Sequence, residues 1–405
     1  MSLLPVDEAL ARILAAASPL PAETVRLADA AGRTLDADLA ARRDQPPVAV
    51  SAMDGWAVRA ADVAAAPATL RKIGTSAAGH GFPGTLGAGE TVRIFTGAPL
   101  PAGADAVVMQ EDAEAEGDAV TLRVAVPAGR HVRRAGIDFR AGDALLRAGD
   151  LIDAHRLALI AAMNHASLAV ARRPRVAILA TGDELVAPGV EPGPDQIVAS
   201  NHLGVAAGVV AAGGEPIDLG IARDDHRDLA AAIRRAQDEK ADVLVTLGGA
   251  SVGDLDLVQE ALGRAGMDLG FWRIAMRPGK PLMFGRIGGM IALGLPGNPV
   301  SALVCARLFL RPLLRALQGD PRAGDDPTSP GLLGADMSAN DQRQDYLRAT
   351  LTRNADGAPL LTPLAVQDSS VLRVLAAAQA LIVRPPHAPA AKAGERCRYV
   401  PLGPD

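Results

Sequence analysis

The sequence is poor in aromatic residues and in cysteine, and both scarcities argue against whole classes of protein. Aromatic residues make up 2% of the 405 residues, so the chain lacks an aromatic platform on which single-stranded nucleic acid could stack. The two cysteines, Cys305 and Cys397, lie far apart, which argues against a disulfide framework and fits a reducing compartment. Neither cysteine has metal-ligand spacing, and the seven histidines form no His-x-x-x-His pair, so a zinc site is not expected.

Charge and hydropathy exclude further partners. The net charge is −5, and without a basic excess we expect no nucleic-acid partner. No uninterrupted apolar run approaches the roughly 20 residues of a membrane helix. Asp7, Glu8 and Arg12 interrupt the N-terminal apolar stretch, and Leu10, Ile13 and Leu14 repeat at helical spacing, which predicts an amphipathic helix and not a signal peptide. We therefore expect a folded cytoplasmic protein with no membrane partner.

The organisation along the chain predicts four domains. Residues 1–43 and 131–171 are expected to form a discontinuous N-terminal helical and linker domain. Residues 44–130 are rich in Gly and Pro and predict a small β-rich domain, and residues 328–405 predict a small C-terminal β domain. In residues 172–319 apolar strands such as "RVAILA" alternate with helices such as "DHRDLAAAIRRAQDEK". This alternation predicts a doubly wound α/β domain whose parallel sheet is covered on both faces.

Acids and glycines follow the predicted strands of this α/β domain. In open α/β sheets, ligands bind beyond the carboxyl ends of the strands. Each acid alone reads as a helix cap or a solvated loop end, but their concentration at one edge predicts a ligand site. The residues are Asp183 and Glu184 in "TGDEL", Asp224 and Asp225 in "RDDH", Ser251, Asp254 and Asp256 in "GGASVGDLD", and Asn298 and Pro299 at the helix start "LPGNPVSA".

A basic turn follows in "FWRIAMRPGKPLMFG". Arg273, Arg277 and Lys280 lie within eight residues, and they form either a solvated turn or an oxyanion clamp, since guanidinium groups match tetrahedral oxyanions. Acids and bases at one cleft suit a phosphorylated ligand with a divalent metal. The stretch "GHGFPG" fits a dinucleotide fingerprint literally but does not open a helix, so we reject that interpretation. In "SAMDGWAV", Asp54 either makes a turn with Gly55 or presents a carboxylate for chemistry.

Six motifs in order resemble the molybdopterin molybdenumtransferases of the MoeA type, the family that includes the gephyrin E domain. They are "SAMDGWAV", "RIFTGAPLPAGADAVVMQED", "TGDEL", "GGASVGD", "MRPGKPLMFG" and "GLPGNPVSA". The resemblance implies a four-domain fold with a MogA-like α/β domain and a C-terminal β-barrel-like domain. It also implies Mg²⁺-dependent insertion of molybdate into adenylylated molybdopterin, with release of AMP and of molybdenum cofactor.

The same resemblance implies partners and site residues. The family is an elongated homodimer with sites at the subunit interface. The further partners that the resemblance suggests are molybdopterin adenylyltransferase and molybdoenzyme chaperones. We expect Asp54 to complete the site of the partner subunit. The implied catalytic residues are Asp54, Thr96, Asp138, Glu184, Asp224 and Asp256, of which the last three are also metal ligands. The implied substrate-binding residues are Gly248, Gly249, Ser251, Arg273, Pro296, Gly297, Asn298 and Pro299, and the implied molybdate-binding residues are Arg277, Lys280, Ser301, Arg348 and Ser369.

The chain departs from the family pattern at four positions, of which the alanine of "GGASVG", where the family has "GGVSVG", is a minor change. Arg273 and Arg277 stand where the family often has Lys, and the usual "QGS" reads "QDS". Asp368 would repel molybdate unless its carboxylate points away, which puts Ser369 in question. Two other functions stay open: a molybdopterin adenylyltransferase, which would need residues 172–319 alone, and a non-catalytic molybdopterin-binding scaffold.

Overall fold

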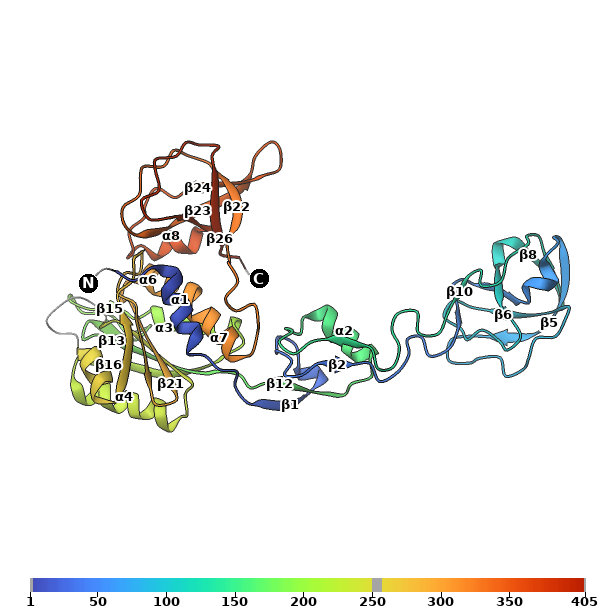
Figure 1. Cartoon of the computed structure of the whole chain (residues 1–405), viewed down its shortest axis with the longest axis horizontal. Helices are drawn as coiled ribbons and strands as arrows, with labels where there is room; N and C mark the ends of the chain where they lie inside the picture. Colours follow the sequence, from blue (N-terminus) through green and yellow to red (C-terminus); the bar gives the residue numbers. More distant parts are fainter. Residues whose placement is uncertain (1–2, 250–256, 404–405) are drawn as a thin grey trace. The chain divides into compact units, whose positions relative to one another are not determined.

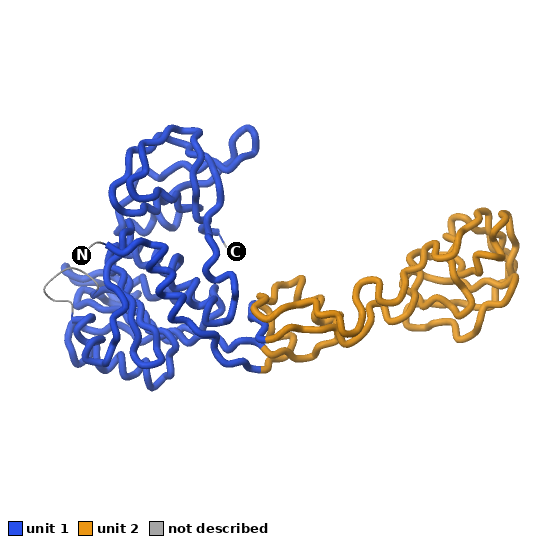
Figure 2. The backbone as a smooth tube through the Cα atoms, viewed as in Figure 1, with its two compact units in different colours: residues 1–23, 32–36, 170–405 blue, residues 24–31, 37–169 orange. Residues whose placement is uncertain are grey.

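The computed structural model describes residues 3–249 and 257–403, and its contacts divide the chain into two compact units. Unit 1 comprises residues 1–23, 32–36 and 170–405, and unit 2 comprises residues 24–31 and 37–169 (Figure 2). The sequence grouped residues 1–43 with 131–171, whereas contacts assign 1–23 and 32–36 to the unit that holds the α/β sheet. The four predicted domain borders stay predictions. None of the helices in the described ranges combines the length and apolar character needed to cross a membrane.

The α/β part of unit 1 is built on one twisted sheet (Figure 1). Its strands, in spatial order, are β16 (Glu215–Ala222), β13 (Arg175–Thr181), β17 (Val243–Leu247), β21 (Met290–Leu295), β20 (Met283–Ile287) and β18 (Met267–Trp272). Strands β16, β13, β17 and β21 pair in parallel, as the alternation of strands and helices predicted. Strand β20 is antiparallel to both neighbours, a reversal at one side of the parallel sheet that the sequence did not predict. The reason is local, because only Gly288 and Gly289 join β20 to β21, and such a connection makes a hairpin.

Helices cover both faces of this sheet. One core contains Val176 and Ile178, and the other contains Ala177 and Leu179, so successive residues of β13 face opposite sides. The first face packs against α1 (Val6–Ala15), α3 (Asn201–Ala211), α6 (Pro299–Cys305), the π-helical segment η4 (Ala306–Leu310) and α7 (Arg311–Leu317). The second face packs against α4 (His226–Asp238) and α5 (Leu257–Arg264).

The C-terminal part of unit 1 is a small closed barrel, as predicted. Its strands are β22 (Ser329–Leu333), β23 (Gln344–Arg353), β24 (Pro359–Pro363), β25 (Ala380–Arg384) and β26 (Arg396–Pro401), and the pairing of β25 with β23 closes the ring. The short strand β19 (Met276–Arg277) of the α/β part pairs with β23, and α8 (Leu372–Ala377) precedes β25. A short parallel pair, β14 (Leu185–Val186) and β15 (Ile197–Val198), follows β13 in the chain.

Unit 2 is built mainly of short strands. A six-stranded sheet within its described residues has the order β7 (Ala106–Met109), β4 (Gly55–Val58), β6 (Glu90–Ile94), β5 (Ala68–Ser76), β9 (Ala119–Leu122) and β8 (Ala113–Glu116). Two-stranded pairs join β3 (Val50–Ser51) to β10 (Val132–Arg133), β2 (Leu39–Ala40) to β11 (Ala144–Leu146), and β1 (Ala22–Arg26) to β12 (Ser167–Ala171). Helix α2 (Ala154–Ala162) and the 3₁₀ turns η1 (Leu27–Asp29), η2 (Ala60–Val63) and η3 (Gln110–Asp112) complete the elements.

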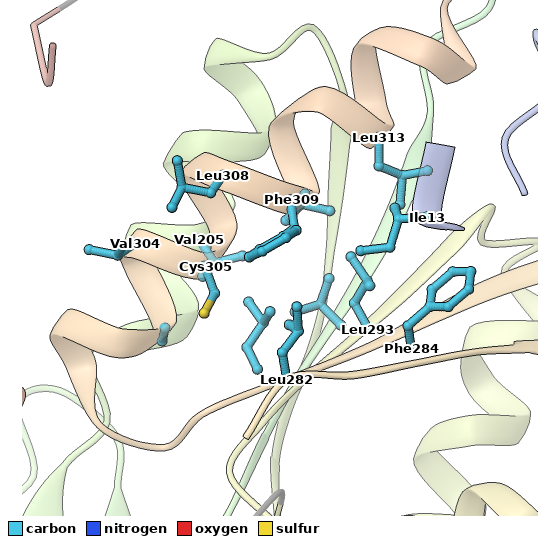
Figure 3. Packing of buried hydrophobic residues seen from close by; sticks show 14 of the residues in the cluster. Ile13, Val205, Leu282, Phe284, Leu293, Val304, Cys305, Leu308, Phe309 and Leu313 are labelled. Atoms are coloured by element: carbon cyan, nitrogen blue, oxygen red, sulfur yellow. The ribbon is translucent and has the colours of Figure 1, made fainter. Parts of the chain in front are cut away.

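Helix α1 anchors the N-terminus in the core of unit 1. Ala9 and Ile13 are fully buried there, and Figure 3 shows Ile13 near Leu313 of α7 and Leu293 of β21. Just before the helix, the backbone of Leu4 accepts a hydrogen bond of 2.7 Å from Ala275 N. The N-terminal segment therefore supports the turn that carries the basic residues.

We predict that Ile13→Ala destabilises unit 1 by about 2–5 kcal/mol, because it opens a cavity in a packed core. Arg12→Ala is the matched control on the same helix: its surface pair with Glu8 is worth at most about 1 kcal/mol. Urea-induced unfolding, followed by circular dichroism, measures both. Equal losses for the two variants would contradict the assignment of α1 to this core.

Candidate active site

Four parallel strands end at one edge of the α/β sheet. Thr181 is paired with Ala222, and Leu247 is paired with Leu295, and these four residues are the last of β13, β16, β17 and β21. The segments that follow carry the predicted Glu184, Asp224, Gly248, Gly249, Pro296, Gly297, Asn298 and Pro299. The structure therefore brings these residues to the same edge. The predicted Ser251 and Asp256, and the neighbouring Asp254, lie outside the described residues.

The glycines at this edge bring backbones into direct contact. Gly248 has a φ of +106°, and a Cβ there would lie 2.8 Å from the carbonyl oxygen of Thr181. A Cβ on Gly297 would lie 3.5 Å from the Cα of Gly248. Asn201, the first residue of α3, donates from Nδ2 to the Gly297 carbonyl oxygen at 2.7 Å. Glycine is therefore required at these positions by the close approach of the protein's own segments at this edge.

The acids at this edge have different roles. Asp225 caps α4, since its Oδ1 accepts from Arg227 N at 2.7 Å and Asp228 N at 2.9 Å. The neighbouring Asp224 makes no such cap. Its pKa is raised, first by desolvation and then by repulsion from Asp183 and Glu184. The interpretation as a helix cap therefore holds for Asp225. Asp224 instead lies among carboxylates whose negative charges repel one another.

The described carboxylates at this edge are too few to coordinate a metal ion without other ligands. The ranges 3–249 and 257–403 contain no cluster of three or more Asp, Glu, His or Cys side chains that could hold a metal. Mg²⁺ normally keeps several waters and uses one or two carboxylates together with substrate phosphates. Within the described residues, this edge therefore offers the one or two carboxylates that such an ion uses, Asp224 and Glu184.

A second group of polar residues lies where the barrel meets α6. Arg348 on β23 is 1% exposed, and burial lowers the pKa of its guanidinium, with Asp368 opposing that shift. Its Nη2 donates to the Asp368 carbonyl oxygen at 3.2 Å, and its buried Nε has no hydrogen-bond partner in the part of the chain that the structure describes. Asn298 Nδ2 donates to Ser369 Oγ at 3.1 Å, and Val300 N donates to the Ser369 carbonyl oxygen at 3.1 Å. Ser301 lies in the first turn of α6 and is buried.

Asp368 is turned toward its own loop. Its Oδ1 accepts from Ser370 Oγ at 2.6 Å and from Ser370 N at 2.7 Å. These two bonds lower the pKa of the Asp368 carboxyl group. Gln367 ties the same loop to Arg348 through hydrogen bonds with its backbone N–H and carbonyl groups. These bonds turn the carboxylate toward Ser370 and keep it ionised, so its negative charge remains in the loop beside Ser369.

The three cations of the basic turn have different surroundings. Arg273, with a φ of +75°, stacks its guanidinium 4.1 Å from the ring centroid of Trp272. Arg277 is bound by carboxylates of the barrel: its Nε donates to Asp345 Oδ1 at 2.8 Å, and its Nη2 also reaches Asp345 Oδ2. Lys280 is exposed, and within the described residues its ammonium group makes no hydrogen bond or ion pair.

Unit 2 holds Asp54 in a defined position. Asp54 Oδ1 accepts from Thr96 N at 2.7 Å and from Thr96 Oγ1 at 2.8 Å, and these two bonds lower the pKa of the carboxyl group. Arg93 adds a smaller lowering, and its guanidinium lies between the rings of Trp56 and Phe95 at 5.3 Å and 4.9 Å from their centroids. The described contacts do not connect Asp138 to Asp54. Asp54 is therefore a fixed, ionised carboxylate and not merely a turn residue.

Several residues of these networks were missed from the sequence. Asn201 and Asp345 each bind a predicted residue, and the charge of Arg93 acts on Asp54. Asn201 follows Ser200 at the start of a predicted helix, and a polar residue there gives a weak signal. No local pattern could pair Arg277 with an acid 68 residues away.

Comparison with known proteins agrees with this fold. Family models match the MoeA N-terminal region (domain I and II) over residues 4–164, a probable molybdopterin binding domain over residues 177–316, and the MoeA C-terminal region (domain IV) over residues 330–402. A molybdopterin-binding α/β domain thus lies between two MoeA-type regions.

Whole-chain relatives extend the match. Molybdopterin molybdenumtransferase 2 of Mycobacterium tuberculosis is 37% identical over 385 residues, which cover 92% of this chain and 92% of that protein. Molybdopterin molybdenumtransferase of Haemophilus influenzae is 33% identical over 403 residues, covering 99% of each chain. A solved molybdopterin biosynthesis MoeA protein from Pyrococcus horikoshii is 30% identical with a TM-score of 0.83, covering 99% of this chain and 100% of that one. The chain belongs to the MoeA family of molybdopterin molybdenumtransferases, which are transferases of molybdenum cofactor biosynthesis.

We predict that Thr96→Val raises the pKa of Asp54, because it removes the hydroxyl donor while keeping the backbone donor and the side-chain shape. Thr96→Ser, which keeps the hydroxyl, should leave the pKa close to that of the parent protein. Titration of the Asp54 carboxyl carbon by NMR measures both. An unchanged pKa in Thr96→Val would mean that the hydroxyl does not stabilise the carboxylate.

Proposed function

We propose that this chain catalyses Mg²⁺-dependent insertion of molybdate into adenylylated molybdopterin, with release of AMP. One observation above all supports this reaction. A buried arginine with an unpartnered Nε, Arg348, lies beside Ser369 and the start of α6, in the same unit as the strand-end carboxylates. Unit 1 would thus hold both a site for an oxyanion, at Arg348, and a site for a phosphorylated group, at the strand ends. A reaction that joins an oxyanion to a phosphorylated substrate needs both.

The molybdate oxyanion would bind among Lys280, Arg348, Ser301, Ser369 and Asn298. Lys280 and Arg348 supply positive charge, and the hydroxyl and amide groups supply directed hydrogen bonds. A bound oxyanion would give the buried Nε of Arg348 the acceptor that it lacks. The exposure of Lys280 leaves its ammonium group accessible to an entering anion.

The molybdopterin part of the substrate would lie at the sheet edge, beside the segments that carry Gly248, Gly249, Pro296 and Gly297. Asn201 holds the last of these segments in place through the Gly297 carbonyl. Arg273 would bind a phosphate with the edge of its guanidinium, because its face is stacked on Trp272.

Glu184 and Asp224 would hold Mg²⁺, together with Asp256 outside the described residues. When bound, Mg²⁺ neutralises the charge that a phosphoanhydride develops as it is cleaved. Asp224 and Glu184 repel each other in the protein alone, so a cation between them removes an electrostatic penalty. Asp183 supports the pair, since its Oδ1 accepts from Asp224 N at 3.2 Å.

We also propose that the active form is a homodimer in which Asp54 of one chain completes the site of the other. The support is chemical: Asp54 is ionised and held by Thr96, as a residue that acts on a substrate must be, yet the described contacts of unit 2 give it no cation to bind except the distant charge of Arg93. Asp138 of the same unit is exposed and is proposed as a further acid of that site.

We predict that purified protein releases AMP and forms active cofactor when given adenylylated molybdopterin, molybdate and Mg²⁺. Glu184→Gln should lower this activity by at least about a hundredfold, because it removes a charge that stabilises the reacting group. Asp225→Asn is the matched control: asparagine caps a helix as well as aspartate does, so activity should stay close to that of the parent protein. Absence of AMP release by the parent protein would reject the reaction, and full activity of Glu184→Gln would remove that residue from the site.

We predict that mixing Asp54→Ala chains with Glu184→Ala chains restores about a quarter of the parent activity. Half of randomly mixed dimers are heterodimers, and each has one of its two sites intact if Asp54 acts on the partner subunit. Each variant alone should be inactive. If mixed dimers form, as shown by native mass spectrometry, but recover no activity, Asp54 does not act across subunits.

A further inference from the structure

Arg277 is the most heavily bonded cation of the basic turn. Its guanidinium makes four hydrogen bonds to three residues of the barrel: two to Asp345, one to Asp341 and one to Asn340. Arginine has five N–H donors, so one is left for any other acceptor. The bond with Asp345 is also the largest cause that raises the pKa of Arg277.

The charge around Arg277 is already balanced. Asp341 Oδ2 is 3.2 Å from Arg277 Nη1 and 3.0 Å from Arg343 Nη2, and together these two arginines lower the pKa of Asp341 to about 2. Two guanidinium groups thus face two carboxylates, Asp341 and Asp345. A net-neutral cluster has little electrostatic attraction for an entering oxyanion.

Asp345 depends on Arg277. Asp345 is 5% exposed, and both of its oxygens are bound by the Arg277 guanidinium. Removing one partner of a buried pair leaves an uncompensated charge, which is strongly unfavourable. The backbone joins the same two segments, since Gln344 N donates to the Ala275 carbonyl oxygen at 2.8 Å and β19 pairs with β23.

The ion pair links the segments that carry the other two cations. Lys280 lies three residues after Arg277 on the turn, and Arg348 lies three residues after Asp345 on β23. Unlike Arg277, Arg348 has an unpartnered Nε and Lys280 an unpartnered ammonium group within the described part of the chain. The Arg277–Asp345 pair therefore joins the turn that carries Lys280 to the strand that carries Arg348.

We propose that Arg277 is a positioning residue, whose guanidinium latches the turn carrying Lys280 onto the strand carrying Arg348, and that Lys280 and Arg348 contact the oxyanion. This assignment replaces the molybdate-binding role that the resemblance implied for Arg277. It rests on the proposed function, because the oxyanion in question is the molybdate of that reaction.

The test compares Arg277→Met, Asp345→Asn and the double variant, with molybdate binding to the full chain measured by calorimetry. For a latch, each single variant should weaken binding by about tenfold, and the double variant should be no weaker than the worse single one, since both remove one interaction. For a direct ligand, Asp345→Asn would leave binding unchanged or tighten it, because it frees the Arg277 guanidinium, and the latch would be wrong. Thermal unfolding of each variant checks that it is folded.

Two matched substitutions sharpen the result. Arg343→Met removes another guanidinium from Asp341 without touching Asp345, and binding should stay within about twofold of the parent protein. Arg277→Lys keeps the charge but loses the two-pronged contact, so its binding should fall between those of the parent protein and Arg277→Met. If Arg343→Met weakened molybdate binding as much as Arg277→Met, the cause would be the general surface charge, and the latch would be wrong.

A second readout does not depend on the reaction. The Gln344 amide, which donates to the Ala275 carbonyl oxygen, should exchange with solvent faster in both Arg277→Met and Asp345→Asn, because the two segments separate more often. If the parent protein neither binds nor inserts molybdate, the proposed function fails while this exchange still reports on the latch. Unchanged Gln344 exchange in both variants would overturn the latch whatever the reaction.

Discussion

The parallel pairing of β13, β16, β17 and β21 is the constraint on which the larger unit depends. The side chains within the strands are buried in the two cores, since successive residues such as Ile178 and Leu179 face two different helical layers. Polar groups can therefore gather only where the strands end. Because the four strands end in register, the acids and glycines that follow them meet at one edge, where open α/β sheets bind their ligands.

This constraint also explains how much could be predicted. Strand ends are local in sequence, so the acids at Glu184 and Asp224 and the glycines at 248–249 could be placed at one edge from the alternation of strands and helices. The reversed direction of β20 was missed, although the two-glycine connection at 288–289 was a readable hairpin signal. The pairing of Arg277 with Asp345 joins two domains across 68 residues, and no local pattern specifies such a contact.

Guanidinium geometry accounts for two departures of this chain from its family. Arg273 presents a flat face to Trp272, and Arg277 presents a two-pronged edge to Asp345. A lysine ammonium group could keep either charge, but it can neither stack a planar group nor bind both carboxylate oxygens in parallel. The two arginines therefore serve fixed orientations: Arg273 through the neighbouring Trp272, and Arg277 through Asp345, which lies outside the basic turn and could not be found from it.

The burial of Arg348 connects stability to function. A cation that is 1% exposed has lost its hydration, and burial without full hydrogen bonding is costly. The Asp368 carbonyl oxygen satisfies one nitrogen, while the Asp368 carboxylate is turned to Ser370 and does not neutralise the guanidinium directly. Had that carboxylate paired with Arg348, the barrel would be more stable and the oxyanion would have a competitor. The local turn made by Asp368 thus keeps an acid in the site loop while leaving the buried charge of Arg348 available to an anion.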